Sequence, residues 1–323
     1  MKDFSGKTAI VTGGGTGMGR ELVRQLVAEG CHVAFCDISA SAMAETRALC
    51  EAAGLPQGLR LTHHVADVSD EAQVLRFRDE AAAQHGVDHI HLLFNNAGIG
   101  GGGSMIADPR SAWERTFNIC WGGVYLNTRA FLPMMMKAEA GHIINTSSIN
   151  GFWASIGPHT PHTAYAAAKF AVKGFTEALI ADLRVNAPHI KCSVVMPGHI
   201  GTSIAANSRR IHLGTESDTM SAAEIAATRA RLVAAGLAAE TIADDAVRGI
   251  VAERARRFLE NAPMTAAAAA TVILDAVKAG KWRILVGDDA QKLDQRVRNT
   301  PEAAYDIDFF NDFARDVGWQ LGR

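Results

Sequence analysis

The feature that most constrains the fold of this chain is a glycine cluster between a strand-like run and a helix-like segment. The apolar run at residues 7–11 is typical of a buried strand, and TGGGTGMG follows it at residues 12–19. Glycines let the backbone turn tightly and approach a phosphate, and the N-terminus of the next helix offers free N–H groups to an anion. A glycine cluster alone also suits a flexible loop, but its place between strand and helix predicts a dinucleotide-binding turn. The expected cofactor contacts in this turn are Gly13, Gly15, Thr16, Gly17, Met18 and Gly19.

Apolar runs of strand length alternate with helix-length segments along most of the chain. Further strands are expected at 32–38, 60–68, 91–95, 142–146, 190–196 and 283–286, and the two longest helices at about 109–138 and 163–186. Strands that alternate with helices form a parallel sheet that is covered on both faces. We therefore expect an α/β fold of the doubly wound Rossmann type, with a seven-stranded, mostly parallel sheet. The sequence suggests one domain over 1–323, with a helical insertion at 203–263 and a C-terminal extension at 287–323.

Composition and charge exclude several other classes of protein. The 323 residues are 48% hydrophobic and 20% charged, and the net charge of −2 offers no basic surplus for nucleic acid. The five cysteines form no CxxC pair, which is typical of reduced intracellular thiols. The polar N-terminus does not resemble a signal peptide, and the alanine-rich run at 266–274 is too short to span a bilayer. These observations predict a cytoplasmic protein that binds neither nucleic acid nor membrane.

Asp37 ends the second expected strand, 24 residues after the first glycine of the turn. A carboxylate at this place accepts hydrogen bonds from both hydroxyls of an adenosine ribose and repels a 2′-phosphate, which favours NAD over NADP. An Asp that merely closes a strand-end turn is the alternative interpretation. Arg20 directly follows the glycine turn and is able to neutralise a 2′-phosphate. NADP therefore stays open as the alternative cofactor.

Tyr165 and Lys169 are four residues apart on a predicted helix, so they share one face of it. A phenol has a reference pKa of about 10 and is a poor base at neutral pH. An ammonium about 5 Å away, at an effective dielectric constant of about 20, contributes roughly 3 kcal/mol and lowers that pKa by about 2 units. The pair is therefore expected to exchange a proton near neutral pH. Alone, such a spacing is also common by chance on amphipathic helices.

Further motifs occur here in the same order as in the short-chain dehydrogenase/reductase family. NNAG stands at residues 95–98, Asp67-Val68 ends the third expected strand, and PGHIGT at residues 197–202 is similar to the family's PGxxxT. With the TGxxxGxG turn and YxxxK, the resemblance covers about residues 5–202 plus the last expected helix and strand. It implies a nicotinamide cofactor. Beyond the glycine turn, the cofactor residues that it implies are Asp37, Ile38, Asp67, Val68, Asn95, Asn96, Ala97, Gly98, Tyr165, Lys169, Pro197, Gly198, Ile200 and Thr202.

The resemblance also implies hydride transfer between the cofactor and an alcohol or ketone, with four catalytic residues. Tyr165 exchanges the proton of the substrate oxygen, and Lys169 lowers the tyrosine pKa and holds the nicotinamide ribose. Ser148 orients the substrate oxygen, and Asn118 anchors a water that passes the proton on through Lys169. Ser148 is preferred over its neighbour because Gly151 completes the family's Ser-x-x-Gly pattern. The gap of 17 residues from Ser148 to Tyr165 is longer than the family's, which predicts an enlarged loop beside the substrate.

The expected substrate is a secondary alcohol or its ketone, bulky and apolar or aromatic, in contact with Phe152, Trp153 and His199. Two alternatives stay open: an NADPH-dependent carbonyl reductase, and a dinucleotide-binding regulator without catalysis. The family further implies a homodimer or homotetramer built on the two long helices. No metal site is expected, because the histidines lack partners at ligand spacing. The aromatic residues near 309–313 are expected to pack on the body of the protein or on a neighbouring subunit.

Overall fold

The computed structural model describes residues 1–158, 160–213, 220–234 and 238–319. Stretches 214–219 and 235–237 of the expected insertion, and 320–323 of the expected extension, lie outside the described residues. The chain forms a seven-stranded sheet in which every neighbouring pair is parallel, with the order β3-β2-β1-β4-β5-β6-β9. The strands are β1 (Thr8–Thr12), β2 (His32–Asp37), β3 (Leu61–Val65), β4 (Leu92–Asn95), β5 (Gly141–Thr146), β6 (Ile190–Pro197) and β9 (Arg283–Val286). The predicted doubly wound sheet is confirmed.

The strand order reverses between β1 and β4. From β1 the chain first adds β2 and β3 on one side, and then returns to add β4, β5 and β6 on the other. At such a switch point the loops at the carboxyl ends of the two central strands diverge, which leaves a crevice for a ligand. The glycine turn after β1 and the NNAG segment after β4 therefore begin at the same edge of the sheet.

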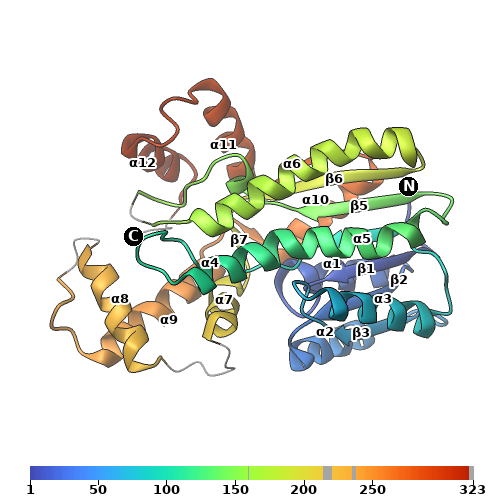
Figure 1. Cartoon of the computed structure of the whole chain (residues 1–323), viewed down its shortest axis with the longest axis horizontal. Helices are drawn as coiled ribbons and strands as arrows, with labels where there is room; N and C mark the ends of the chain where they lie inside the picture. Colours follow the sequence, from blue (N-terminus) through green and yellow to red (C-terminus); the bar gives the residue numbers. More distant parts are fainter. Residues whose placement is uncertain (159, 214–219, 235–237, 320–323) are drawn as a thin grey trace.

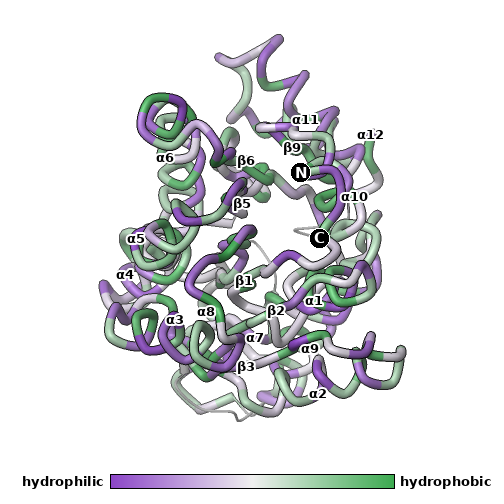
Figure 2. Tube along the Cα trace, turned by 90° about the vertical axis from the view of Figure 1, so that its right-hand side faces the viewer, coloured by the Kyte–Doolittle hydropathy of each residue, from purple (hydrophilic) through white to green (hydrophobic). Residues whose placement is uncertain are grey.

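Two layers of helices cover the sheet, as Figures 1 and 2 show. One face carries α1 (Gly17–Ala28), α2 (Ala40–Ala52) and α10 (Ala266–Lys278), and the other carries α3 (Glu71–His85), α4 (Arg110–Phe117), α5 (Gly123–Met135) and α6 (Thr163–Asn186). Leu22, Leu26 and Ile273 are buried in the core on the first face. Phe77 and Phe131 are buried in the core on the second face, with their rings 5.5 Å apart.

The long helix expected at about 109–138 is broken into α4, a π-helical turn at Asn118–Gly122, and α5. Two glycines meet at the end of this turn. A Cβ on Gly123 would lie 2.7 Å from a methyl group of Val68, so the helix backbone packs directly on the loop after β3. A π turn holds one more residue than an α turn, and it rotates the residues on its two sides relative to each other.

The expected insertion contains α7 (Ile204–Leu213), α8 (Ala222–Ala234) and α9 (Asp244–Glu260), flanked by the short parallel pair β7 (Ile200–Gly201) and β8 (Met264–Thr265). Figure 1 shows these helices at one end of the molecule. The C-terminal residues form α11 (Asp288–Asn299) and α12 (Ile307–Asp316). Phe309, Phe310 and Phe313 of α12 pack around the buried ring of Trp153, so this tail packs on the body of its own chain.

Candidate active site

The glycine turn is so tight that side chains would not fit at several of its positions. Gly13 has φ +69°, and a Cβ there would lie 2.9 Å from the Cα of Ala97. A Cβ on Gly19 would lie 2.0 Å from the carbonyl oxygen of Gly13. The Thr12 hydroxyl accepts hydrogen bonds from the backbone N–H groups of Asn96 (3.0 Å) and Ala97 (3.1 Å), which joins this turn to the segment after β4. The start of α1 therefore points its first N–H groups into the crevice between β1 and β4.

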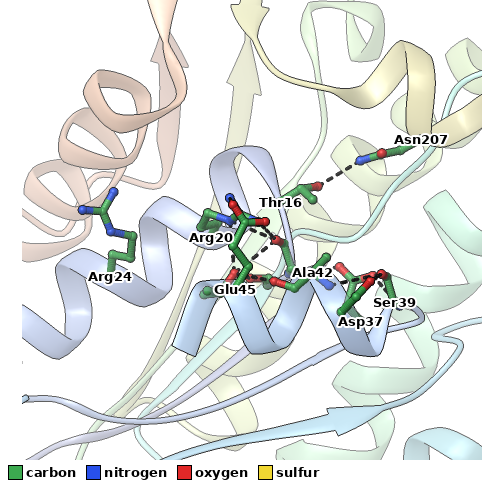
Figure 3. A network of polar contacts seen from close by, with 12 residues as sticks. Thr16, Arg20, Arg24, Asp37, Ser39, Ala42, Glu45 and Asn207 are labelled. Atoms are coloured by element: carbon green, nitrogen blue, oxygen red, sulfur yellow. Dashed lines mark hydrogen bonds and ion pairs between the residues drawn. The ribbon is translucent and has the colours of Figure 1, made fainter. Parts of the chain in front are cut away.

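Asp37 stands beside this turn at the end of β2 (Figure 3). Its Oδ2 accepts a hydrogen bond from the N–H of Gly15 (3.0 Å), and its Oδ1 accepts one from the N–H of Ser39 (3.1 Å). Burial raises the pKa of the Asp37 carboxyl above its usual value, while these hydrogen bonds and the charge of Arg20 act in the opposite direction. Next to it, Ile38 is 48% exposed and offers an apolar surface.

Some of the other expected cofactor residues lie beside the crevice, and others make contacts inside the protein that fix the segments around it. Thr16 precedes α1, and Thr202 lies 3.2 Å from the Cβ position of Gly17 across the crevice. Met18 packs against the core of the first face. Asn95 is buried, and its amide donates to Thr128 and Asn145. Its side chain therefore connects elements inside the protein.

Three further cofactor residues also have structural contacts. Asp67 Oδ1 accepts hydrogen bonds from both the N–H and the hydroxyl of Ser69. In the segment Pro197–Thr202, Ile200 is buried, and a Cβ on Gly198 would lie 2.2 Å from an oxygen of Asp289. These residues fix the loops that form the rim of the crevice.

Ser148, Tyr165 and Lys169 meet at the carboxyl end of β5. Lys169 Nζ lies 5.3 Å from the centre of the Tyr165 ring and donates a hydrogen bond to the Thr146 carbonyl oxygen (2.8 Å). The Ser148 side chain forms a hydrogen bond with the hydroxyl of Tyr165. The Ser147 hydroxyl instead donates to the Lys169 carbonyl oxygen (2.7 Å) and binds α6 to the strand end. Ser148 is thus the hydroxyl that faces the tyrosine.

Burial has the largest effect on the protonation of this group. Burial raises the pKa of Tyr165 well above its ordinary value, and the hydrogen bond from Ser148 opposes that shift only in part. Burial also lowers the pKa of Lys169. A buried site disfavours the charged form of each group, so burial acts against both the phenolate and the ammonium. Tyr165 is therefore a neutral hydroxyl.

The structure does not bring Asn118 into this group. Asn118 is exposed at the start of the π turn, and its expected role beside Lys169 stays a prediction. Cys120, two residues later, is completely buried, and its Sγ accepts from the N–H of Ile99 (3.4 Å) and donates to the carbonyl oxygen of Ile99 (3.1 Å). A methyl group on Gly98 would lie 3.4 Å from Lys169 Nζ and 3.5 Å from Cys120 Sγ. Sequence reasoning missed Cys120, and a spacing of two residues from Asn118 places the two side chains on different faces of a helix.

The expected substrate residues lie mostly inside the protein. Trp153 is fully buried, and its indole N–H donates to the Ala304 carbonyl oxygen (2.6 Å). Phe152 packs against the same C-terminal cluster. His199 is buried, its backbone N–H donates to Asp289 (2.7 Å), and its ring N–H donates to the Phe258 carbonyl oxygen (2.8 Å). Trp153 and His199 therefore do not form a substrate surface in this structure, because their polar groups and rings are engaged by distant parts of the chain.

His162 lies against the tyrosine, with ring centres 4.7 Å apart. Burial lowers the pKa of His162 to about 4, so the imidazole is neutral at ordinary pH. Within the described ranges no group of three or more histidine, cysteine or acidic side chains is arranged to hold a metal ion. None of the helices in the described part of the chain is long and apolar enough to cross a membrane.

The parallel sheet has a glycine turn at its switch point and a Ser–Tyr–Lys group at the same edge. These features define a dinucleotide-binding protein of the Rossmann class. Residues 7–212 match the family model described as short chain dehydrogenase. The chain belongs to this family, and its C-terminal residues extend beyond the matched region. It is an oxidoreductase that uses a nicotinamide cofactor.

Individual relatives support the family from both sequence and structure. The chain is 34% identical over 249 residues to SadH of Mycobacterium tuberculosis, named as an oxidoreductase, covering 77% of this chain and 86% of SadH. It is 38% identical over 189 residues to a 3-alpha-(or 20-beta)-hydroxysteroid dehydrogenase of the same species, covering 57% and 68%. A short-chain dehydrogenase/reductase of Burkholderia phymatum, solved in complex with NAD, superposes with a TM-score of 0.73 at 28% identity and covers 94% and 96%. A metagenomic short-chain oxidoreductase solved with NADP superposes with a TM-score of 0.53 at 30% identity and covers 60% and 83%.

Proposed function

We propose that this protein is an NAD-dependent dehydrogenase that interconverts a secondary alcohol and its ketone. The observation that carries the proposal is the arrangement of Tyr165 between the Ser148 hydroxyl and the Lys169 ammonium, at the strand end next to the glycine turn. A regulator without catalysis would not require a neutral tyrosine hydroxyl with a hydrogen-bonding serine on one side and a buried cation on the other.

The residues that line the crevice fit a dinucleotide. The glycine turn packs so tightly on its neighbours that its backbone is held in place, and the start of α1 offers free N–H groups to a pyrophosphate. NAD supplies the ring carbon that takes or gives the hydride. Lys169 has donors beyond the one used by Thr146, and these would bind the nicotinamide ribose.

In the proposed reaction, Ser148 donates a hydrogen bond to the substrate oxygen and Tyr165 transfers the proton. A raised pKa keeps the tyrosine protonated, which suits donation to a ketone oxygen in the reducing direction. That donation leaves a phenolate, which the Lys169 charge stabilises. In the oxidising direction this phenolate takes the proton from the alcohol and becomes the hydroxyl again. Cys120 takes the place beside Lys169 that the sequence assigned to Asn118, where it holds the Ile99 backbone.

The proposed substrate is bulky and apolar. The relative named as a hydroxysteroid dehydrogenase acts on such a ring system by its name, and burial of the site favours an apolar ligand. NAD is proposed over NADP because Asp37 ends β2 beside the turn, where a carboxylate repels a 2′-phosphate. The superposition with an NADP complex keeps an NADPH-dependent carbonyl reductase as the second candidate.

We also propose that the chain assembles as a homodimer or homotetramer through α5 and α6. Trp121, Tyr125, Phe170 and Phe175 bring aromatic rings to this surface, and Tyr125 and Phe170 are 44% and 43% exposed. Exposed apolar rings of this kind are typical of a protein contact. Sedimentation of the intact chain tests this assembly, and a mass of one chain at every concentration would contradict it.

Tyr165→Phe is the test of the proposed chemistry. It removes only the hydroxyl, so we expect a loss of turnover of at least about a thousandfold with unchanged NADH binding, as for a group that transfers the proton. Turnover is followed by NADH absorbance with a panel of bulky secondary alcohols and ketones, and binding by NADH fluorescence. Tyr125→Phe, at the exposed tyrosine of α5, is the matched control and keeps full activity. Near-normal rates in Tyr165→Phe would refute the mechanism.

A further inference from the structure

Arg20 lies near the start of α1, beside the glycine turn, and its guanidinium is held from several sides (Figure 3). Nε donates to the Gly15 carbonyl oxygen (3.0 Å) and to the Thr46 hydroxyl (3.1 Å). Nη2 donates to the same carbonyl oxygen (2.7 Å) and to Glu45 Oε2 (2.7 Å), and Nη1 donates to Glu45 Oε1 (3.0 Å). The Glu45 carboxylate therefore accepts from both Nη1 and Nη2, in the bidentate geometry that arginine and carboxylate prefer.

The peptide of Gly15 is the centre of this arrangement. Its N–H donates to Asp37 Oδ2 (3.0 Å), and its carbonyl oxygen accepts two hydrogen bonds from Arg20. A Cβ on Gly15 would lie 2.8 Å from Asp37 Oδ2, so the carboxylate and the turn are in close contact. The position of Arg20 and the position of Asp37 are thus set relative to each other through one peptide group.

This arrangement bears on the choice between NAD and NADP. A 2′-phosphate on the adenosine ribose would lie where Asp37 receives the ribose hydroxyls, and an arginine within reach would compensate its charge. Arg20 has five N–H donors on three nitrogens. Each of the three nitrogens donates to Glu45, Gly15 or Thr46. Only 17% of the Arg20 side chain is exposed, whereas 61% of Glu45 is exposed. The carboxylate closes the solvent side of the arginine.

We propose that Glu45 is a specificity-determining positioning residue: it fixes Arg20 on the Gly15 carbonyl and so withholds from a 2′-phosphate a cation beside the turn that would accept it. Asp37 repels the phosphate directly, and Glu45 acts through Arg20. The inference rests on the proposed NAD dependence of this site and deepens it. Removal of the Asp37 charge alone should then give only part of the possible NADP affinity.

The test measures binding of two adenosine probes, 5′-ADP and 2′,5′-ADP, by titration calorimetry at low and at high salt. We expect Asp37→Asn to weaken the preference for 5′-ADP. Asp37→Asn/Glu45→Gln should bind 2′,5′-ADP about fivefold to tenfold more tightly than Asp37→Asn alone, because a bidentate ion pair no longer holds the guanidinium. That gain should fall at high salt and disappear when Arg20→Gln is added. The ratio of kcat/KM for NADP to that for NAD should change in the same order.

Glu51→Gln is the matched control, because Glu51 lies on the same helix, is 48% exposed and pairs with Arg47 outside this network. In the Asp37→Asn background it should leave 2′,5′-ADP affinity unchanged. Equal affinity in Asp37→Asn and Asp37→Asn/Glu45→Gln would overturn the inference, as would a gain that survives Arg20→Gln. If the unaltered protein binds neither probe, the proposed cofactor site itself is wrong, so the two failures are distinguishable. Equal binding of 5′-ADP in Asp37→Asn and in Asp37→Asn/Glu45→Gln shows that the second substitution leaves the site intact.

Discussion

At the scale of single residues, neighbouring polar side chains have different roles: one makes a structural hydrogen bond and the next faces the proposed reacting groups. Ser147 binds the Lys169 carbonyl oxygen, which leaves the next hydroxyl, that of Ser148, for Tyr165. The same division separates Asn118, which is exposed, from Cys120, which is buried beside Lys169. A thiol at this place is a weak donor and acceptor, and burial raises its pKa, so it remains neutral. It therefore acts on the site by holding the Ile99 backbone.

Replacement of Cys120 should affect catalysis, whereas replacement of Asn118 should not. We expect Cys120→Ala to lower kcat about tenfold with little change in KM, since about one hydrogen bond that positions the inner wall is lost. Cys120→Ser keeps a donor and an acceptor and should restore most of kcat. Steady-state kinetics over a range of pH is the measurement, because a shifted pH profile marks an altered proton transfer and not only a less stable protein.

Asn118→Ala is the control for this pair, with activity within about twofold of the unaltered protein, as for a surface substitution. A large loss in Asn118→Ala, or none in Cys120→Ala, would restore the assignment made from the sequence.

At the scale of elements, residue spacing predicted the features that depend on the geometry of a single helix or turn. Tyr165 and Lys169 share a face because four residues make slightly more than one helical turn, and the glycine turn follows from its place between β1 and α1. The π turn at Asn118–Gly122 was not predictable from hydrophobic periodicity. The extra residue in a π turn changes which side chains share a face of the helix, and it leaves no mark in the residue types. The burial of Trp153 and His199 was not predictable for a different reason. Their contacts lie at Ala304 and Phe258, far along the chain, where no local pattern records them.

Buried histidines in and around the sheet should make the fold sensitive to acid. Burial lowers the pKa of His142, on β5, to about 3, and that of His91, just before β4, to about 4. The unfolded chain binds these protons near the ordinary pKa of about 6.5 and the folded chain does not, so stability is full above that value. It falls as pH drops from about 6.5 towards 3, by up to about 1.4 kcal/mol per pH unit for each histidine.

His142→Gln should therefore reduce the slope of unfolding free energy against pH by about one proton between pH 6 and 4. Its Nε2 contacts the Ser193 hydroxyl at 2.6 Å, and an amide is able to replace that contact. Urea unfolding at a series of pH values provides the slope. His89→Gln, at a side chain that is 41% exposed, is the comparison and should leave the slope nearly unchanged. Equal slopes in all three proteins would contradict the proposed origin of the acid sensitivity.

At the scale of the whole molecule, the C-terminal residues are tied to the rim of the crevice. Asp289, near the start of α11, accepts hydrogen bonds from the His199 backbone (2.7 Å) and the Trp319 indole (3.0 Å). The His199 ring also packs against Phe258 of α9, with ring centres 4.5 Å apart. The segment Pro197–Thr202 is thus in contact with both the insertion and the tail. The stability of the tail and the shape of the crevice are expected to change together.

Phe313→Ala tests whether the tail belongs to the core of a single chain. Its ring is 1% exposed and lies 6.2 Å from that of Trp153 and 5.1 Å from that of Trp319, so its loss should cost about 3–5 kcal/mol of unfolding free energy. Ile307→Ala, at a 57% exposed side chain at the start of α12, should cost less than about 1 kcal/mol. Thermal unfolding followed by tryptophan fluorescence measures both. Because the aromatic cluster lies within one chain, the difference between the two variants should be the same at high and low protein concentration. A penalty for Phe313→Ala that vanishes on dilution would mean that a neighbouring subunit, and not this chain, receives the tail.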